Sequence, residues 1–220
     1  MQAKIIYEDS QLIVCVKPAG MAVQTRRVGE MDLYSELMNH VAGKNEKNVP
    51  YIGIVHRLDQ PVEGVMVFAK TREAAAALNR QLQEYGFGKY YYAVTKGMPE
   101  PKSGTMTDYL RKDGKTNTSL VVDEKTPGAK KAVLNYEVLG QREDKSLVRI
   151  QLKTGRHHQI RVQMAHAGCP LLGDRKYGTA GKGEPSLALC AYRLSFLHPT
   201  EGTPMEFEIV PEGAGFHGML

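Results

Sequence analysis

Short apolar runs separated by glycine, proline and charged residues dominate the chain, and they predict a protein with more strands than helices. Apolar residues recur at helical spacing in 31–41, and an alanine-rich run from Thr71 to Leu82 begins with a threonine that can cap a helix. The segments predicted to be strands are 4–7, 11–16, 65–69, 89–95, 104–110, 118–122, 132–139, 146–153, 187–196 and 205–210.

The stretch 54–59 is predicted to be a strand that leads into a tight turn, because proline and glycine follow it and the apolar run 65–69 leaves it. Asp59 would then lie at the tip of the turn, rigidly held and within reach of a substrate. An alternative is that Asp59 only caps the turn by accepting backbone hydrogen bonds. The neighbouring His56 and Arg57 favour a chemical role, since they place donors beside the acid.

A second informative stretch, 154–168, is predicted to be a turn that opens a short helix, which Gly168 ends. This helix carries Arg161 at its side. Three consecutive tyrosines, 90–92, occupy one predicted strand, and the alternation of side chains along a strand places Tyr91 on the opposite face from the other two. All three rings can simply pack in a core, or one of them can be presented to a flat substrate.

The composition is that of an ordinary globular protein, with 42% hydrophobic and 24% charged residues in a chain of 220. The formal net charge of +5 permits a nucleic-acid partner without requiring one, and we interpret the basic residues between 111 and 131 as a solvated face. No apolar run is long enough to span a bilayer, so no membrane partner is expected. The three cysteines form no Cys-x-x-Cys pair, which favours reduced thiols in a cytoplasm over a disulfide scaffold or a zinc site.

Metal and serine or cysteine chemistry are poorly supported. His157, His158 and His166 lack the spacing and the matching acid of a metal site, so we expect hydrogen-bonded histidines and no metal. The sequence contains no Gly-x-Ser-x-Gly elbow, P-loop or Gly-x-Gly-x-x-Gly fingerprint. If Asp59 and Arg161 meet, the guanidinium would keep the carboxylate ionised and aimed, able to act as a nucleophile or a base. This combination favours an enzyme that acts on a nucleic-acid base or sugar.

Four segments resemble motifs of RNA pseudouridine synthases of the RluA type, and together they cover nearly the whole chain. His-Arg-Leu-Asp at 56–59 is similar to the catalytic motif of that family. The segment 13–21 resembles its strand and Lys-Pro-x-Gly turn, and 89–93 resembles its Lys-x-Tyr strand. The long segment 154–178 resembles its C-terminal motif, which is the most specific of the four.

The resemblance implies an α+β fold with a central mixed, mainly antiparallel sheet, flanking helices, and a cleft that receives Asp59 and Tyr91. It implies one catalytic domain over residues 1–220, with no separate N-terminal RNA-binding domain. The implied activity is isomerisation of specific uridines in structured RNA, either rRNA or tRNA, to pseudouridine, with no metal or organic cofactor. A cytoplasmic protein is expected, with a monomer favoured.

The resemblance also implies roles for single residues. Asp59 resembles the essential carboxylate, which attacks the sugar at C1′ or initiates cleavage of the N-glycosidic bond. Tyr91 resembles the ring that packs on the base and assists proton removal from C5, and Arg161 resembles the partner of the acid. Arg57 resembles the residue that fills the gap left by the flipped nucleotide, and Ile160 would pack beneath the base. Further substrate-binding candidates are His56, Arg156, His158 and Gln159.

The chain departs from the family pattern after the catalytic motif, where Val62 and Glu63 replace small hydroxyl residues, and at Gln163, where His is common. Two other functions are therefore weighed. An RNA-binding protein that has lost turnover predicts RNA binding without pseudouridine. A carboxylate-dependent hydrolase of nucleosides or glycosides predicts release of free base and a second catalytic carboxylate. Selection of the RNA is expected from the loops 43–50 and 98–130.

Overall fold

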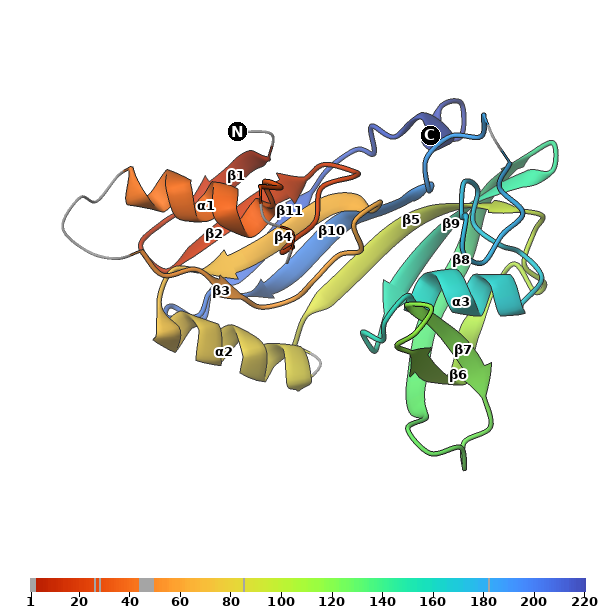
Figure 1. The fold of residues 1–220 in the computed structure, drawn as a ribbon, viewed down its shortest axis with the longest axis horizontal. Coiled ribbons are helices and arrows are strands. Elements are labelled where there is room, and N and C mark those ends of the chain that lie inside the picture. Colours follow the sequence, from red (N-terminus) through yellow and green to blue (C-terminus); the bar gives the residue numbers. More distant parts are fainter. Residues whose placement is uncertain (1–2, 26, 28, 44–49, 85, 182) are drawn as a thin grey trace. The chain divides into compact units, whose positions relative to one another are not determined.

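The computed structural model describes residues 3–25, 27, 29–43, 50–84, 86–181 and 183–220. The chain forms two compact units (Figure 1). The first unit comprises Met1–Gly88 and Ala191–Val210, and the second comprises Lys89–Cys190 and Pro211–Leu220. Most of the loop 43–50, which we expect to help select the RNA, lies outside the described residues.

The first unit is built on a sheet in which β1, β2, β4 and β10 are neighbours in that order, with β3 beside β4 and β11 beside β10. The bounds are β1 (Lys4–Glu8), β2 (Leu12–Lys17), β3 (Gly53–Ile54), β4 (Glu63–Ala69), β10 (Leu189–Leu197) and β11 (Pro204–Glu208). Strands β2 and β4 pair antiparallel from Leu12 opposite Ala69 to Lys17 opposite Gly64. The end of β2 therefore lies beside the point where the turn after Asp59 re-enters the sheet.

Helix α2 (Arg72–Gln83) covers one face of this sheet. Thr71 caps it as predicted, because its side chain accepts the backbone N–H of Ala74 at 3.1 Å. The buried stripe of the helix, which includes Leu78, packs against Val14 of β2 and Val67 of β4 in one apolar core. Burial of this stripe, more than the alanine content of the helix, holds α2 on the sheet.

Helix α1 (Leu33–Ala42) covers the opposite face of the same strands (Figure 1). Asp32 caps this helix by accepting the backbone N–H of Ser35 at 2.7 Å. Cys15 follows Val14 in β2 and so points to the other face, where burial, and then the charge of Glu36 in α1, raise the pKa of its thiol to about 12. The sheet of the first unit is thus buried between two helices.

The second unit is an antiparallel sheet in the order β5, β9, β8, β6 and β7, with helix α3 packed on it. The bounds are β5 (Gly88–Lys96), β6 (Ser103–Asp113), β7 (Thr118–Val122), β8 (Lys130–Arg142), β9 (Lys145–Leu152), α3 (Gln159–His166) and the short helix η1 (Ala214–Phe216). Val162 of α3 packs against Leu110 of β6 and Ala132 of β8. In β5, Tyr91 is buried, whereas Tyr90 and Tyr92 are partly exposed, which is the alternation that the sequence predicts.

The predicted α+β class and mainly antiparallel pairing are confirmed, but one predicted strand is wrong. The segment before Asp59 contributes only the two residues of β3, Gly53–Ile54, to the sheet, and 55–62 is irregular. Its apolar pattern arises because Val55, Leu58 and Val62 are each buried from a non-repetitive backbone. A short apolar run cannot distinguish this arrangement from a strand, since both bury their side chains.

Three expectations from composition can be compared with the part of the chain that the structure describes. The thiols of Cys15, Cys169 and Cys190 are buried. No helix in this part is long and apolar enough to cross a membrane. It also contains no group of three or more His, Cys, Asp or Glu side chains that could hold a metal ion. The cytoplasmic location stays a prediction.

Gly64, the second residue of β4, occupies a position where a side chain does not fit. Its φ is +146°, and a Cβ there would lie 2.5 Å from the Cβ and 2.6 Å from the carbonyl oxygen of Ala191 in β10. We therefore expect Gly64→Ala to lower the free energy of unfolding by about 3 kcal/mol or more, because backbone strain and overpacking each cost about 1–3 kcal/mol. Urea denaturation followed by circular dichroism measures this loss.

The matched control is Gly114→Ala, at an exposed turn where a Cβ would meet nothing within 4 Å. This variant is expected to stay within about 0.5 kcal/mol of the wild type. Equal stability of the two variants would contradict the close approach of β4 and β10 at Gly64.

Candidate active site

Asp59 lies on an irregular loop that is anchored on both sides. Leu58 before it and Val62 after it are 8% and 2% exposed, whereas Asp59 itself is only partly buried. The backbone N–H of Val62 donates to the carbonyl oxygen of Asp59 at 3.0 Å, which closes the turn. The carboxylate is therefore carried by a backbone that its neighbours fix in place, as the sequence analysis expected.

Lys17, whose side chain is fully buried, supports this loop. Lys17, at the end of β2, is 0% exposed, and its Nζ donates to the carbonyl oxygens of Pro18 at 2.9 Å, Met21 at 2.7 Å and Gln60 at 3.1 Å. Burial lowers the pKa of Lys17 to about 8, and the charges of Asp59 and Glu63 partly oppose this effect. Lys17 therefore joins the Lys-Pro-x-Gly turn to the residue that follows Asp59.

Gly20 completes the same connection. Its backbone N–H donates to the carbonyl oxygen of Gln60 at 2.9 Å, and the Gln60 side-chain amide donates to the carbonyl oxygen of Gly20 at 3.0 Å. Gly20 has φ of +88°, which a residue with a side chain rarely adopts. The backbone of the Asp59 loop thus finds its hydrogen-bond partners in the 17–20 turn instead of in a strand ladder.

The two unusual residues after the catalytic motif have clear positions in this arrangement. Val62 is buried and closes the Asp59 turn with its backbone N–H alone, so it needs no hydroxyl for that bond. The charge of Glu63 raises the pKa of Lys17 against the effect of burial. Glu63 thus interacts electrostatically with the buried amine that supports the loop.

The buried charge of Lys17 gives a prediction about pH. Its pKa is about 8 in the folded protein, against 10.5 for a fully hydrated lysine, so between these values the unfolded chain binds more protons and folding becomes more favourable as pH rises. Relative to Lys17→Met, the unfolding free energy of the wild type should therefore increase by about 3 kcal/mol between pH 7 and pH 10.5. Urea titrations of both proteins across this range measure the difference.

Lys112→Met, which removes a lysine from an exposed position of β6, is the control for that experiment. Its unfolding free energy should follow that of the wild type at every pH. Parallel pH curves for the wild type and Lys17→Met would show that the buried amine is not destabilised by its surroundings.

Two further candidates lie just before Asp59. Arg57 is exposed, and its guanidinium makes long contacts of 3.4 Å with the side-chain and backbone oxygens of Gln24. His56 is partly buried, and its Nε2 accepts the backbone N–H of Val67 at 3.2 Å. Arg57 is thus placed to reach a ligand from the loop surface, whereas His56 fastens the loop to β4.

In the second unit, Arg161 of α3 forms a buried, bidentate ion pair with Asp174. Its Nε and Nη2 each donate to one carboxylate oxygen at 2.8 Å, and the two side chains are 6% and 0% exposed. Burial raises the pKa of Asp174, but the hydrogen bond and charge of Arg161, with the backbone N–H groups of Lys176 and Tyr177, outweigh it, so the net pKa lies below its ordinary value. The guanidinium is therefore held in one orientation, with Nη1 not used by this pair.

Tyr177 connects this ion pair to the histidines that precede α3. The Arg161 guanidinium lies 5.2 Å from the centroid of its ring, and its hydroxyl lies 2.7 Å from Nδ1 of His158 and accepts the backbone N–H of Ser119 at 2.7 Å. The rings of His157 and His158 stack at 3.8 Å. His157 Nδ1 lies 2.9 Å from the Ser119 hydroxyl, so both histidines have hydrogen-bond partners in the protein.

Of the remaining candidates of the second unit, Gln159 and Ile160 begin α3, and Tyr91 lies in β5. Gln159 is 3% exposed, and its Oε1 accepts from the Thr154 hydroxyl at 2.7 Å and from the backbone N–H of Arg156 at 3.0 Å. Ile160 is 4% exposed and Tyr91 is 7% exposed. Gln159 and His158 are buried and stabilise the conformation of the loop 154–158. A direct role of either residue in binding substrate stays a prediction.

Lys17, Asp174 and Tyr177 lie in segments that resemble family motifs, but the sequence alone assigned them no role. Lys17 could have been noticed as a lysine that ends an otherwise apolar strand directly before Pro18. Asp174 and Tyr177 lie in a turn-rich segment whose contact with α3 depends on tertiary structure. These three residues support the candidates Asp59 and Arg161. That Asp59, Tyr91 and Arg161 come together in one site stays a prediction.

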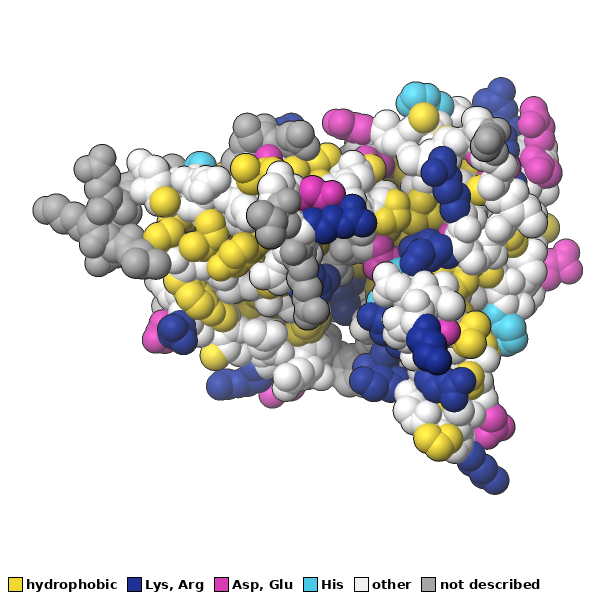
Figure 2. Space-filling model, viewed as in Figure 1, with side chains coloured by type: hydrophobic (Ala, Val, Ile, Leu, Met, Phe, Trp, Pro, Cys, Tyr) yellow, Lys and Arg dark blue, Asp and Glu magenta, His cyan; other side chains and the backbone are white. Residues whose placement is uncertain are grey.

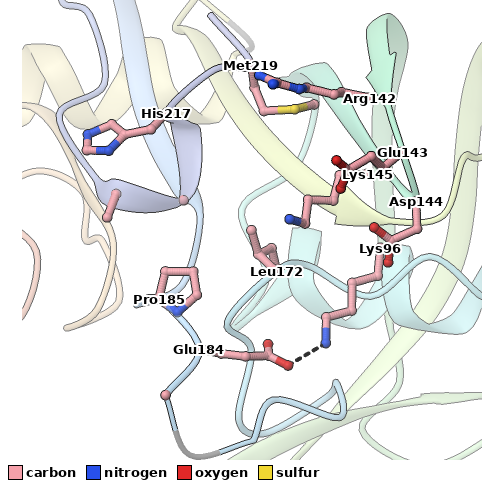
Figure 3. Close-up of a pocket in the computed structure, with 13 residues that line it drawn as sticks. Lys96, Arg142, Glu143, Asp144, Lys145, Leu172, Glu184, Pro185, His217 and Met219 are labelled. Atoms are coloured by element: carbon pink, nitrogen blue, oxygen red, sulfur yellow. Dashed lines mark hydrogen bonds and ion pairs between the residues drawn. The ribbon is translucent and has the colours of Figure 1, made fainter.

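A pocket of about 540 Å³ lies elsewhere in the second unit (Figure 3). It lies between the β8–β9 turn, the loop around Glu184 and the C-terminal segment, with Lys96 paired to Glu184 at 2.7 Å. None of the candidate residues lines it. Its acidic and basic side chains are mixed, so it does not indicate a ligand of one charge.

The chain matches a family model described as RNA pseudouridylate synthase over residues 11–166. It therefore belongs to the RNA pseudouridine synthase family and is by family an isomerase. Ribosomal large subunit pseudouridine synthase D of Zymomonas mobilis is 34% identical over 93% of this chain and 68% of its own length. The protein of the same description from Neisseria meningitidis is 38% identical over 94% of this chain, which spans 58% of that relative.

Solved structures agree on the fold. The chain is similar to human RNA pseudouridylate synthase domain containing 4, with a TM-score of 0.78, 24% identity, and coverage of 95% of this chain and 89% of that one. Human RNA pseudouridylate synthase domain containing 1 gives a TM-score of 0.76 at 21% identity, covering 96% and 84%. The α+β architecture is thus that of pseudouridine synthase domains.

Proposed function

We propose that the protein converts a uridine in ribosomal RNA to pseudouridine and that Asp59 is the essential carboxylate. The observation that carries the proposal is the Asp59 loop, within the segment that matches the family. Lys17 and Gly20 both hold this loop by donating hydrogen bonds to the carbonyl oxygen of Gln60. A carboxylate held in one orientation loses little entropy when it meets a substrate, which is what a nucleophile or base requires.

The proposed reaction exchanges one bond for another. The N1–C1′ bond of the uridine breaks, the base rotates, and a C5–C1′ bond forms, while the proton on C5 is lost and N1 gains one. Asp59 either attacks C1′ or initiates cleavage of the glycosidic bond. The nucleotide must leave its stack, at a cost of a few kcal/mol, and single-stranded loops make this step easiest.

The other candidates have proposed roles around the everted nucleotide. Tyr91 packs on the base and assists removal of the C5 proton, and Ile160 packs beneath the base. Arg161, oriented by Asp174, pairs with the catalytic carboxylate. Arg57, exposed beside Asp59, fills the space that the nucleotide leaves in the RNA.

The choice of RNA rests on the relatives. The Zymomonas mobilis and Neisseria meningitidis relatives are each named ribosomal large subunit pseudouridine synthase D, which favours a uridine of large-subunit rRNA over one of tRNA. Basic side chains are gathered over β6, β7 and the neighbouring loops of the second unit (Figure 2), as an anionic polymer would require. Their exposed members include Arg111, Lys112, Lys115, Lys125 and Lys131.

Mapping pseudouridine in rRNA and tRNA from cells with and without the gene tests this proposal. We expect one or more sites in large-subunit rRNA to disappear and to return when the gene is restored. Loss of tRNA sites alone would contradict the choice of rRNA. Persistence of every site would contradict the function and leave an RNA-binding protein without turnover.

A further inference from the structure

Lys89, in strand β5 opposite Leu152 of β9, is a partly buried lysine with no acidic partner among the described residues. Its amine lies against Gly155: a Cβ built on this glycine would be 3.3 Å from Lys89 Nζ. Buried lysines are normally paired, because an unpaired ammonium group loses hydration without compensation. Lys89 is therefore in an unusual position for a lysine that serves only the fold.

Arg156 brings a second positive charge to the same place. Its Nε donates to the carbonyl oxygen of Lys131 at 2.8 Å, and its backbone N–H donates to the Gln159 side chain at 3.0 Å, so the residue is fixed at the surface. No carboxylate of the residues that the structure describes forms an ion pair with it. Burial lowers the pKa of Lys89, and the charge of Arg156 lowers it further. The two cations thus repel each other, and Gly155, which lies against the Lys89 amine, directly precedes Arg156 in the chain.

The chemistry of the pair indicates the kind of anion that would neutralise it. A guanidinium offers a planar fork of donors and an ammonium group offers a compact point charge, and both are common ligands of phosphate oxygens. Gly155 is exposed and has no side chain, so an anion can approach its backbone closely. A phosphodiester has two non-bridging oxygens and can therefore accept hydrogen bonds from both cations.

We propose that Lys89 and Arg156, with Gly155 between them, form a binding site for one phosphodiester of the substrate RNA. The proposal rests on the proposed function, because RNA supplies the anion. Binding removes the repulsion between the two cations and offsets the cost of burying the amine, so part of the free energy of RNA binding comes from this site. Lys89 then contacts the substrate backbone directly. It lies two residues before Tyr91 in β5, so both side chains are on the same face of the strand.

The salt dependence of RNA binding tests the site. Fluorescence anisotropy with a labelled single-stranded RNA that contains the mapped uridine gives the affinity across a salt series for the wild type, Lys89→Gln and Gly155→Ala. Each phosphate contact on a single strand contributes about 0.7 to the slope of log affinity against log salt concentration. We expect Lys89→Gln to lose about this much slope and about tenfold in affinity, and Gly155→Ala, whose charge is unchanged, to weaken binding because its methyl group displaces the amine.

Lys4→Gln, at an exposed position of β1, is the matched control and should keep the wild-type slope and affinity. Circular dichroism confirms that the variants are folded. An equal loss of slope in Lys4→Gln and Lys89→Gln would show a diffuse charge effect and overturn the site. Wild-type slope and affinity in Lys89→Gln would overturn it as well.

A second measurement separates a phosphate contact from a structural role. NMR of lysine side chains labelled at Cε should show the pKa of Lys89 rising when the RNA is added, because the phosphate stabilises the charged form. No change would contradict the site, and the same rise with inorganic phosphate at equal concentration would identify free phosphate, not RNA, as the ligand. Failure to form pseudouridine would contradict only the proposed function if the slope and the pKa still respond as expected.

Discussion

Asp59→Ala should abolish pseudouridine formation, with the rate falling by at least about 10⁴-fold, which corresponds to about 5.5 kcal/mol of transition-state stabilisation. The loss is expected because the substitution removes the carboxylate that is proposed to attack C1′ or begin cleavage of the glycosidic bond. The loop itself should persist, since Lys17 and Gly20 hold it through the backbone of Gln60. Nucleoside mass spectrometry of rRNA incubated with each protein measures the rate.

Glu63→Gln is the informative comparison for this variant. It removes the nearest carboxylate in sequence after Asp59, and the isomerase should keep most of its activity without it. A glycoside hydrolase that works with two carboxylates would instead lose turnover in both variants. Retention of wild-type pseudouridine formation by Asp59→Ala would remove this residue from the mechanism.

Asp174→Ala is expected to destabilise the second unit strongly. It would remove the carboxylate that pairs with the buried side chain of Arg161, and breaking a buried ion pair in this way costs about 3–5 kcal/mol. Pseudouridine formation should fall too, because the two 2.8 Å bonds that orient Arg161 are lost. Chemical denaturation measures the first effect and nucleoside analysis the second.

The double variant Arg161→Met with Asp174→Leu separates stability from function. Replacing both charges by apolar side chains of similar size should restore most of the unfolding free energy, because no buried charge is left unpaired. Activity should be lost, since no guanidinium remains at position 161. A loss of stability below about 1 kcal/mol in Asp174→Ala would show that Arg161 finds solvent or another partner without cost.

Much of the fold could be predicted because local patterns determined it. The Thr71 cap, the alternation of the tyrosines in β5 and the β8–β9 hairpin each follow from propensity or from the period of the apolar residues. The strand expected before Asp59 could not be predicted correctly, since its buried apolar side chains are arranged on an irregular backbone. That backbone is stabilised by the 17–20 turn, which is distant in sequence.

The site shows the same division between local and distant information. Asp59, Arg57 and Arg161 received roles from the motifs, whereas Lys17 and Asp174 lie in the same motifs without an assigned role. Lys17 acts on Gln60 from another strand, and Asp174 reaches Arg161 from a loop that follows α3. Such contacts between segments distant in sequence carry no periodic signal, so they become visible only in three dimensions.

The proposed reaction isomerises uridine within an intact RNA chain. RNA labelled with tritium at C5 of uridine provides the most direct measurement, since the C5 hydrogen must leave when the new C5–C1′ bond forms. With the wild-type protein and an RNA containing the mapped uridine, we predict release of tritium into water, retention of the base in the RNA, and no free uracil. Release of uracil, or no release of tritium from that RNA, would contradict the account.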